Sequence, residues 1–208
     1  MGETYLDARL AATIALVVHA VGLVLAFGVR TWRHRRATGS TGFRGVSGRP
    51  GSLPWWGGVL FVLALLLATA APVLALTGVL AAPPGLVRVA TAALGVLVAV
   101  AGLAVTVLAQ NAMGASWRIG VDESERTALV EAGPFRRVRN PIFTGMAAVL
   151  VGVVLLVPTV VAVLALVCLV VAVQIQVRVI EEPYLARAHG PAYADYRART
   201  GRFLPRLR

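Results

Sequence analysis

Charged side chains are scarce in this sequence of 208 residues. They make up 14% of it, whereas hydrophobic residues make up 58%, and the mean hydropathy is +0.80. A composition this apolar excludes an ordinary soluble domain and is typical of an integral membrane protein. The single cysteine, Cys168, lies inside an apolar run, so no disulfide can form within the chain.

Lysine and several familiar motifs are also absent. All 20 basic residues are arginines, which gives a formal net charge of +11. We expect no nucleic-acid partner, because the arginines are not interleaved with aromatic residues and no nucleic-acid-binding motif is present. No metal-ligand motif is present, and no Gly-x-Gly-x-x-Gly stands between a strand and a helix, so we expect neither a metal nor a soluble Rossmann domain. Glu3 and Asp7 precede the first apolar run, where a signal peptide would be positively charged, so no signal peptide is expected.

Apolar runs dominate what is present. Five of them are long enough, or nearly so, to cross a bilayer as helices, and they cover residues 10–29, 55–80, 86–109, 142–157 and 159–179. Pro158 divides the last two runs, which predicts a tight helical hairpin whose first helix is only about 24 Å long. We therefore predict an all-α fold, an integral membrane helical bundle of about five transmembrane helices, with a helical hairpin and a cytoplasmic amphipathic C-terminal segment.

The third run carries small residues on one face, and we interpret this stripe as a close helix–helix contact rather than as a functional site. Its members are Ala92, Gly95, Ala99, Gly102 and Thr106. His19 lies within the first run. We expect it to bond to a neighbouring helix, because nothing nearby suggests a metal or a proton relay.

The distribution of arginines predicts the orientation of the bundle. All but Arg9 and Arg88 fall in residues 30–54, residues 110–141 or the C-terminal part of the chain from Arg178 onward. The positive-inside rule then places the N-terminus outside and the C-terminus in the cytoplasm. We expect the protein in the cytoplasmic membrane, surrounded by membrane lipids, with its active site on the cytoplasmic side.

A polar, basic stretch at residues 129–145 precedes the fourth run. Gly133-Pro134 is a turn signal, and Asn140-Pro141 has the pattern of a helix N-cap followed by a proline in the first turn. A helix N-terminus near positive charge favours anions, and the nearby arginines are Arg136, Arg137 and Arg139. This stretch therefore predicts a site for a charged ligand.

Two adjacent carboxylates, Glu181 and Glu182, are expected at the C-terminal end of the last membrane helix. The helix dipole disfavours them there and they repel each other, so they need a cation. Arg137 or Arg139 could supply it in an interhelical salt bridge. An ammonium or sulfonium group of a ligand could supply it instead, and the residues alone leave both readings open.

Five motifs follow one another in the second half of the chain: Leu129-Val130-x-x-Gly133-Pro134-Phe135, Arg139-Asn140-Pro141-Ile142-Phe143-Thr144-Gly145, Glu181-Glu182-x-x-Leu185, Gly190-x-x-Tyr193-x-x-Tyr196 and Arg202-Phe203-Leu204-Pro205. Together, over roughly residues 113–205, they resemble the isoprenylcysteine carboxyl methyltransferase family and the related phospholipid N-methyltransferases. The sequence departs from the family pattern at Asn140, where the family has His, and at Phe135 and Phe143, where it has Tyr. These differences suggest a bacterial-type branch.

The resemblance implies a membrane enzyme that holds S-adenosylmethionine between its last helices and its C-terminal segment. It implies N-terminal helices at residues 1–109 and a methyltransferase core at residues 110–208. The implied cofactor-binding residues are Leu129, Val130, Gly133, Pro134, Phe135, Arg139, Asn140, Glu181, Glu182, Tyr193 and Tyr196. Among them, the glutamates would take the ammonium of the cofactor, and Arg139 and Asn140 would lie at its amino-acid end.

The chemistry favours a lipophilic acceptor that is already anionic. A carboxylate needs no general base, whereas an amine must be deprotonated, and Asn140 cannot hold a proton. We name Arg118, Arg139 and Asn140 as catalytic candidates, with Arg118 or Arg139 orienting the carboxylate. Trp117, just before Arg118, is either an interfacial anchor or a substrate contact. The alternatives are a phospholipid or amine N-methyltransferase, an NADPH-dependent membrane reductase and a non-enzymatic scaffold.

Overall fold

The computed structural model describes residues 6–43, 45–80, 89–117 and 128–206. Over these residues it is helical and contains no strand. The α-helices are α1 (Ala8–Leu23), α2 (Arg30–Thr38), α3 (Leu53–Leu76), α4 (Val89–Met113), α5 (Pro141–Leu156), α6 (Val160–Ile175) and α7 (Glu182–Arg199). Two π-helical segments, η1 (Val24–Val29) and η4 (Gln176–Glu181), join α1 to α2 and α6 to α7, and two short 3₁₀ turns are η2 (Gly114–Ser116) and η3 (Gly133–Arg136).

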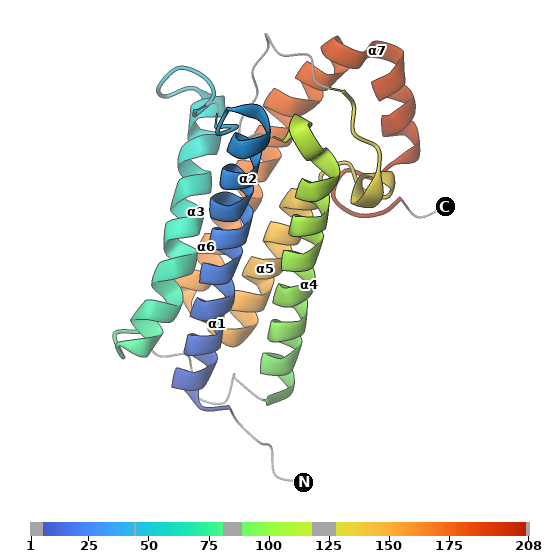
Figure 1. The fold of residues 1–208 in the computed structure, drawn as a ribbon. Helices are drawn as coiled ribbons and strands as arrows, with labels where there is room; N and C mark the ends of the chain where they lie inside the picture. The colour runs from blue at the N-terminus through green and yellow to red at the C-terminus, as the bar shows by residue number, and fades with distance from the viewer. Residues whose placement is uncertain (1–5, 44, 81–88, 118–127, 207–208) are drawn as a thin grey trace.

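Five helices run alongside one another in the bundle: α1, α3, α4, α5 and α6 (Figure 1). At the end of the bundle that holds α2, α7 lies across the helix ends, next to the η3 turn. Within the described part of the chain, four helices are long and apolar enough to cross a membrane, and α5 is a shorter apolar helix. The predicted fold class, an integral membrane helical bundle, is confirmed.

The helical hairpin at Pro158 is present, since α5 ends at Leu156 and α6 begins at Val160. Thr159 caps α6 by accepting a hydrogen bond from the Ala162 N–H at 3.3 Å. Other predicted limits were wrong. The first helix runs on to Thr38 instead of ending near residue 29, because Arg33, Arg35 and Arg36 are good helix formers with exposed side chains.

The small-residue stripe of α4 packs against α5, as predicted. A Cβ placed on Gly102 would lie 2.5 Å from the Gly145 carbonyl oxygen, and one on Gly152 would lie 2.5 Å from the Gly95 carbonyl oxygen. The two backbones therefore touch, which a side chain at any of these positions would prevent. His19 is buried in α1 and hydrogen-bonds the backbone of Leu65 on α3, as expected.

The Gly102–Gly145 contact can be tested with a single methyl group. We expect Gly102→Ala to destabilise the protein by about 1–3 kcal/mol, because the new Cβ overpacks a backbone contact. Gly28→Ala is the matched control, because Gly28 is also helical and has open space around its Cβ position. Thermal unfolding in detergent measures both variants. Equal melting temperatures for the two variants would contradict the close contact.

Candidate active site

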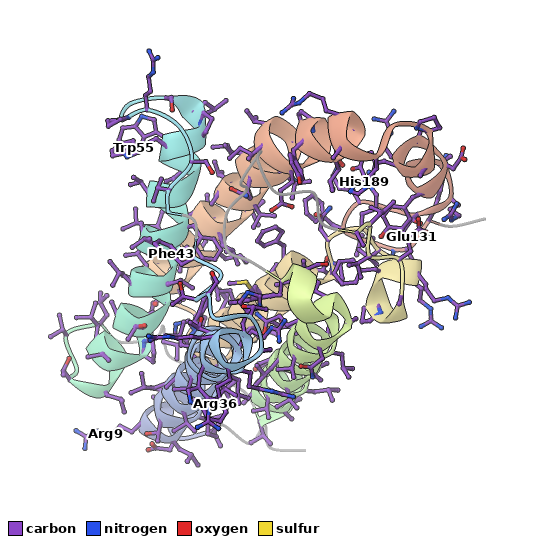
Figure 2. The ribbon with its side chains drawn as sticks, turned by 45° about the horizontal axis from the view of Figure 1, so that its top comes forward. Arg9, Arg36, Phe43, Trp55, Glu131 and His189 are labelled. Carbon is purple, nitrogen blue, oxygen red and sulfur yellow. The ribbon has the colours of Figure 1, made fainter. Side chains whose placement is uncertain are left out.

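The η3 turn and the chain around it form one wall of the site. Gly133 has φ +59°, a conformation that side chains rarely adopt, and it starts the 3₁₀ turn that buries Phe135. The Tyr196 hydroxyl, from α7, donates a 2.8 Å hydrogen bond to the Phe135 carbonyl oxygen. Beside this turn lies the surface residue Glu131, labelled in Figure 2. Its carboxylate pairs with Arg199 at the end of α7. The turn is therefore fastened to α7 in two places.

The C-terminal tail, residues 200–206, runs back along the start of α5. The Arg139 N–H donates to the Gly201 carbonyl oxygen at 2.8 Å, and the Asn140 N–H donates to the Arg202 carbonyl oxygen at 3.1 Å. One turn further on, the Thr144 hydroxyl donates to the Phe203 carbonyl oxygen at 2.8 Å. The second and fifth sequence motifs are thus in direct contact through the tail backbone.

Glu182 accepts hydrogen bonds from two arginines. Arg202 binds it with Nε at 2.8 Å and Nη2 at 2.9 Å, and Arg139 Nη2 lies 3.0 Å from Glu182 Oε1. The Glu182 side chain is only 13% exposed, so this pairing offsets a substantial desolvation cost. The bonds to Glu182 raise the pKa of Arg202. Arg139 Nη1 also donates to the carbonyl oxygens of Arg197 and Thr200.

The expected helix end at Glu181-Glu182 does not exist. The chain continues from α6 through η4 into α7, so no helix C-terminus faces these carboxylates. For Glu182 the salt-bridge reading is confirmed, with Arg139 as one partner. Glu181 differs: its Oε1 accepts a 3.1 Å hydrogen bond from Gln176 Nε2. The two residues are five apart, the spacing that the π-helical segment brings into register.

A first cavity, which we call the donor cavity, has a volume of about 160 Å³ and lies against the start of α5. Its wall includes seven of the eleven residues proposed from the sequence to bind the cofactor: Leu129, Val130, Phe135, Arg139, Asn140, Glu181 and Tyr196. Gly133, Pro134, Glu182 and Tyr193 do not line it and instead shape or tie the surrounding wall. Arg118 lies outside the described residues.

Sequence reasoning missed several lining residues. Tyr184 and Leu185 follow Glu181 by three and four residues, so they share its helix face, and this spacing could have identified them. The others are Met113, Ser116, Ala128, Pro141, Ile142 and Phe143. Most of these are apolar, and nothing in their local sequence distinguishes them from membrane-helix residues.

The polar groups of the donor cavity fit the amino-acid end of S-adenosylmethionine. Arg139 Nε is buried and has no hydrogen-bond partner among the described residues. Its N–H is therefore available to a carboxylate oxygen, which would satisfy it. Glu181 supplies an opposite charge for an ammonium group in the same wall. The remaining lining is mainly apolar, which suits a nucleoside ring.

Asn140 does not cap α5 with its side chain, so that part of the prediction was wrong. It occupies the N-cap position before Pro141, but it makes no side-chain capping bond. Its Nδ2 donates instead to the Arg202 carbonyl oxygen at 3.1 Å. The Asn140 side chain therefore binds the tail rather than the first turn of α5. Without this bond, the Arg202 carbonyl oxygen would be partly buried with one hydrogen bond fewer.

A second cavity also has a volume of about 160 Å³, and we call it the apolar chamber. It is lined by residues from η1, the loop before α3, α3 itself, α4, α5, α6 and η4. Among them are Phe27, Val46, Phe61, Gln110 and Met146. Phe43, which also lines it, lies beside α3 in Figure 2, away from Glu131 and His189. Both cavities include Phe143 and Glu181, so these two residues form the boundary between them.

Trp117 belongs to the wall of the apolar chamber and is only 3% exposed. The guanidinium carbon of Arg30 lies 5.0 Å from its ring centroid, and His34 meets it edge-on at 5.4 Å. An interfacial anchor would be exposed to the membrane surface, so that reading of Trp117 was wrong. The other reading, contact with the substrate, stays a prediction.

This geometry defines a class of protein: a helical membrane protein in which a cavity with a few charged groups adjoins an apolar chamber. Residues 90–192 match the family model described as phospholipid methyltransferase, and over these residues the chain belongs to that family of membrane methyltransferases. The match includes α4 to most of α7 but excludes Tyr193, Tyr196 and the tail. No curated protein and no solved structure matches.

Methyltransferases of this family generally use S-adenosylmethionine. Within the described part of the chain, no group of three or more His, Cys, Asp or Glu side chains is placed to hold a metal ion. What the site binds is therefore determined by the residues that line the donor cavity.

Glu182 is expected to act mainly in folding. Glu182→Gln removes the charge that holds Arg139 and Arg202, and each lost charged hydrogen bond costs about 1.5–3 kcal/mol. We expect a lower melting temperature and faster proteolysis of the tail after Arg199. Glu131→Gln, which breaks an exposed pair, is the matched control and should change stability by less than about 1 kcal/mol. Unchanged melting and proteolysis in Glu182→Gln would contradict this role.

Asn140 provides a second test of the tail contact. An N-cap role would tolerate Asn140→Asp, since Asp is an equally good N-cap. The observed bond requires a donor, and Asp would place an acceptor against the Arg202 carbonyl oxygen. We therefore expect Asn140→Asp to lose about 1–3 kcal/mol of stability without any ligand. Thermal unfolding decides the matter, and a variant as stable as the wild type would restore the capping role.

Proposed function

We propose that this protein transfers a methyl group from S-adenosylmethionine to a lipophilic acceptor, with the cofactor in the donor cavity and the acceptor in the apolar chamber. The observation that carries the proposal is the shared boundary: the donor cavity, which has Arg139 and Asn140 in its wall, and the apolar chamber both include Phe143 and Glu181. A transferase needs two adjacent compartments of this kind, because its two substrates must react in contact while water is excluded.

Within the donor cavity, Arg139 Nε would bind the cofactor carboxylate and Glu181 its ammonium group. Leu129, Val130 and Phe135 would contact its less polar parts. The bound cofactor would supply an electrophilic methyl group. A carboxylate acceptor can take this methyl group directly, because it carries no proton to lose. An amine acceptor must also release a proton. The chain's own contribution is then to orient the two substrates and to keep the boundary dry.

For the acceptor we keep the carboxylate of a lipophilic molecule as the first candidate. No histidine lines either cavity among the described residues, so deprotonation of an amine would rest on the weaker base Glu181. Arg139 already binds Glu182, so the orientation of an acceptor carboxylate would rest on Arg118. An amine acceptor is the second candidate, favoured by Glu181, which puts a carboxylate in the wall of the chamber.

Cofactor binding tests the donor half of the proposal. By calorimetry in detergent, we expect the non-reactive product S-adenosylhomocysteine to bind the wild type and NADPH not to bind. Glu181→Gln should weaken this binding about tenfold to a hundredfold, because one charge-assisted hydrogen bond is lost. The control is Asp195→Asn, which likewise replaces a carboxylate by an amide but on the exposed side of α7. Binding of NADPH alone would support the reductase, and binding of neither would support a scaffold.

The same measurement separates the two acceptor classes. An acceptor carboxylate should bind more tightly when the cofactor ammonium neutralises the charge of Glu181. Because binding couplings are reciprocal, the acceptor should then raise the affinity for the cofactor by the same factor. Palmitate should therefore raise the affinity for S-adenosylhomocysteine by about fivefold or more, whereas hexadecylamine should lower it. Hexadecanol is the neutral control, and the effect should vanish in Glu181→Gln. The opposite pattern, with hexadecylamine raising the affinity, would favour the amine acceptor.

A further inference from the structure

A third hollow lies on the outside of the η3 turn, and neither the donor cavity nor the apolar chamber accounts for it. It is a groove of about 810 Å³, which we call the basic groove. Its walls are the outer side of α4, the η3 turn, the start of α5 and the C-terminal tail. The lining residues are Val105, Gly133, Pro134, Arg136, Arg137, Val138, Pro141, Thr144, Phe203, Leu204 and Pro205. It shares only Pro141 with the donor cavity and no residue with the apolar chamber.

The two charges in the groove have no counter-charge in the described part of the chain. Arg136 and Arg137 are both exposed, and neither takes part in any of the ion pairs found there. The acidic residues nearby are engaged elsewhere, since Glu131 pairs with Arg199 and Glu182 pairs with Arg139 and Arg202. The groove therefore presents two adjacent guanidinium groups to whatever occupies it.

The opposite side of the groove is apolar and faces outward. Leu204 is 74% exposed, and Leu108, one turn from Val105 on α4, is 59% exposed. Exposure of this degree on a helix that is apolar enough to cross a membrane marks a lipid-facing surface. The groove thus joins a hydrocarbon-facing wall to a cationic rim at the end of the bundle.

We propose that the basic groove binds an anionic phospholipid of the surrounding bilayer, with its phosphate on Arg136 and Arg137 and its acyl chains along α4 and Leu204. Guanidinium groups bind phosphate oxygens bidentately, and basic residues at a membrane surface attract anionic lipids. Such a lipid matches the groove in both charge and polarity. The site is separate from the proposed methyl acceptor and does not depend on the proposed reaction.

The position of the groove gives the lipid a structural consequence. Its walls include the η3 turn and the tail, and the chain just after the turn meets the tail backbone at Val138 and Gly201. A lipid in the groove contacts both segments, so it braces the outer side of the donor-cavity wall. Lipid binding should therefore stabilise the tail as well as occupy the groove.

Native mass spectrometry of the full chain tests the proposal with phosphatidylglycerol and phosphatidylcholine as probes. We expect the wild type to retain one phosphatidylglycerol in preference to phosphatidylcholine. The double variant Arg136→Gln/Arg137→Gln should lose at least about tenfold of that preference, because two charged contacts are removed. The double variant Arg33→Gln/Arg35→Gln is the matched control, because it removes the same charge from exposed positions on α2. The control should retain the lipid as the wild type does.

Three results would overturn the proposal: no lipid preference in the wild type, an equal loss in the control, or a retained mass equal to a second copy of the chain. The variant Arg136→Lys/Arg137→Lys covers the case in which the Gln variant fails to fold. It keeps both charges, so it should still prefer phosphatidylglycerol over phosphatidylcholine, and loss of that preference in a folded Lys variant would also count against charge recognition. Phosphatidylglycerol should in addition slow proteolysis of the tail in the wild type and the α2 control.

Discussion

The carboxylate of Glu182 joins three parts of the chain that lie far apart in the sequence. Arg139 comes from the segment before α5, Glu182 from the start of α7 and Arg202 from the tail. A charge that is this little exposed is tolerated only when it is fully paired, and each of these groups would be left uncompensated without the others. Because the terminal nitrogens of Arg139 bind Glu182 and the carbonyl oxygens of Arg197 and Thr200, its Nε remains for the donor cavity. The contacts that hold the tail in place thus also position Arg139 in the donor cavity.

The membrane part of the molecule supplies the rigid frame for this arrangement. Lipid offers no hydrophobic force between helices, so close packing must come from small residues, as between α4 and α5. This contact fixes the start of α5 relative to the end of α4. As a result, Asn140 and Phe143 face Met113 and Ser116 across the donor cavity. A loss of backbone contact near Gly102 would therefore be felt at the site, although no residue there touches the cavity.

The sequence predicts the features that depend only on residue type and on the spacing of residues along the chain. The apolar runs, the break at Pro158 and the stripe that includes Gly95 and Gly102 all follow from residue type and spacing. The continuous helix through Glu181 did not follow, because an acidic pair before a proline has the pattern of a helix end. Pro183 instead falls in the first turn of α7, where its missing N–H costs nothing. The division at residues 109 and 110 stays a prediction.

Contacts made by the main chain are the part of the site that sequence reasoning could not reach. The tail meets α5 through the carbonyl oxygens of Gly201, Arg202 and Phe203, and a carbonyl is present at every residue. The side chain of Asn140 has the pattern of a cap, and only the position of the tail shows that it binds elsewhere. The same holds for Arg139, whose opposite charge to Glu182 predicted the pair but not the bonds to the tail backbone.

The acidic pair shows why neighbouring residues of one type can have different roles. Consecutive residues on a helix point about 100° apart, so Glu181 and Glu182 face different surroundings. Glu182 faces two arginines, whereas Glu181 faces the boundary between the donor cavity and the apolar chamber. A carboxylate in that position couples the two compartments, because charge–charge energies are large where water is scarce. Any cation bound on one side then changes how strongly a charged group is held on the other, so the two binding events are linked by the wall they share.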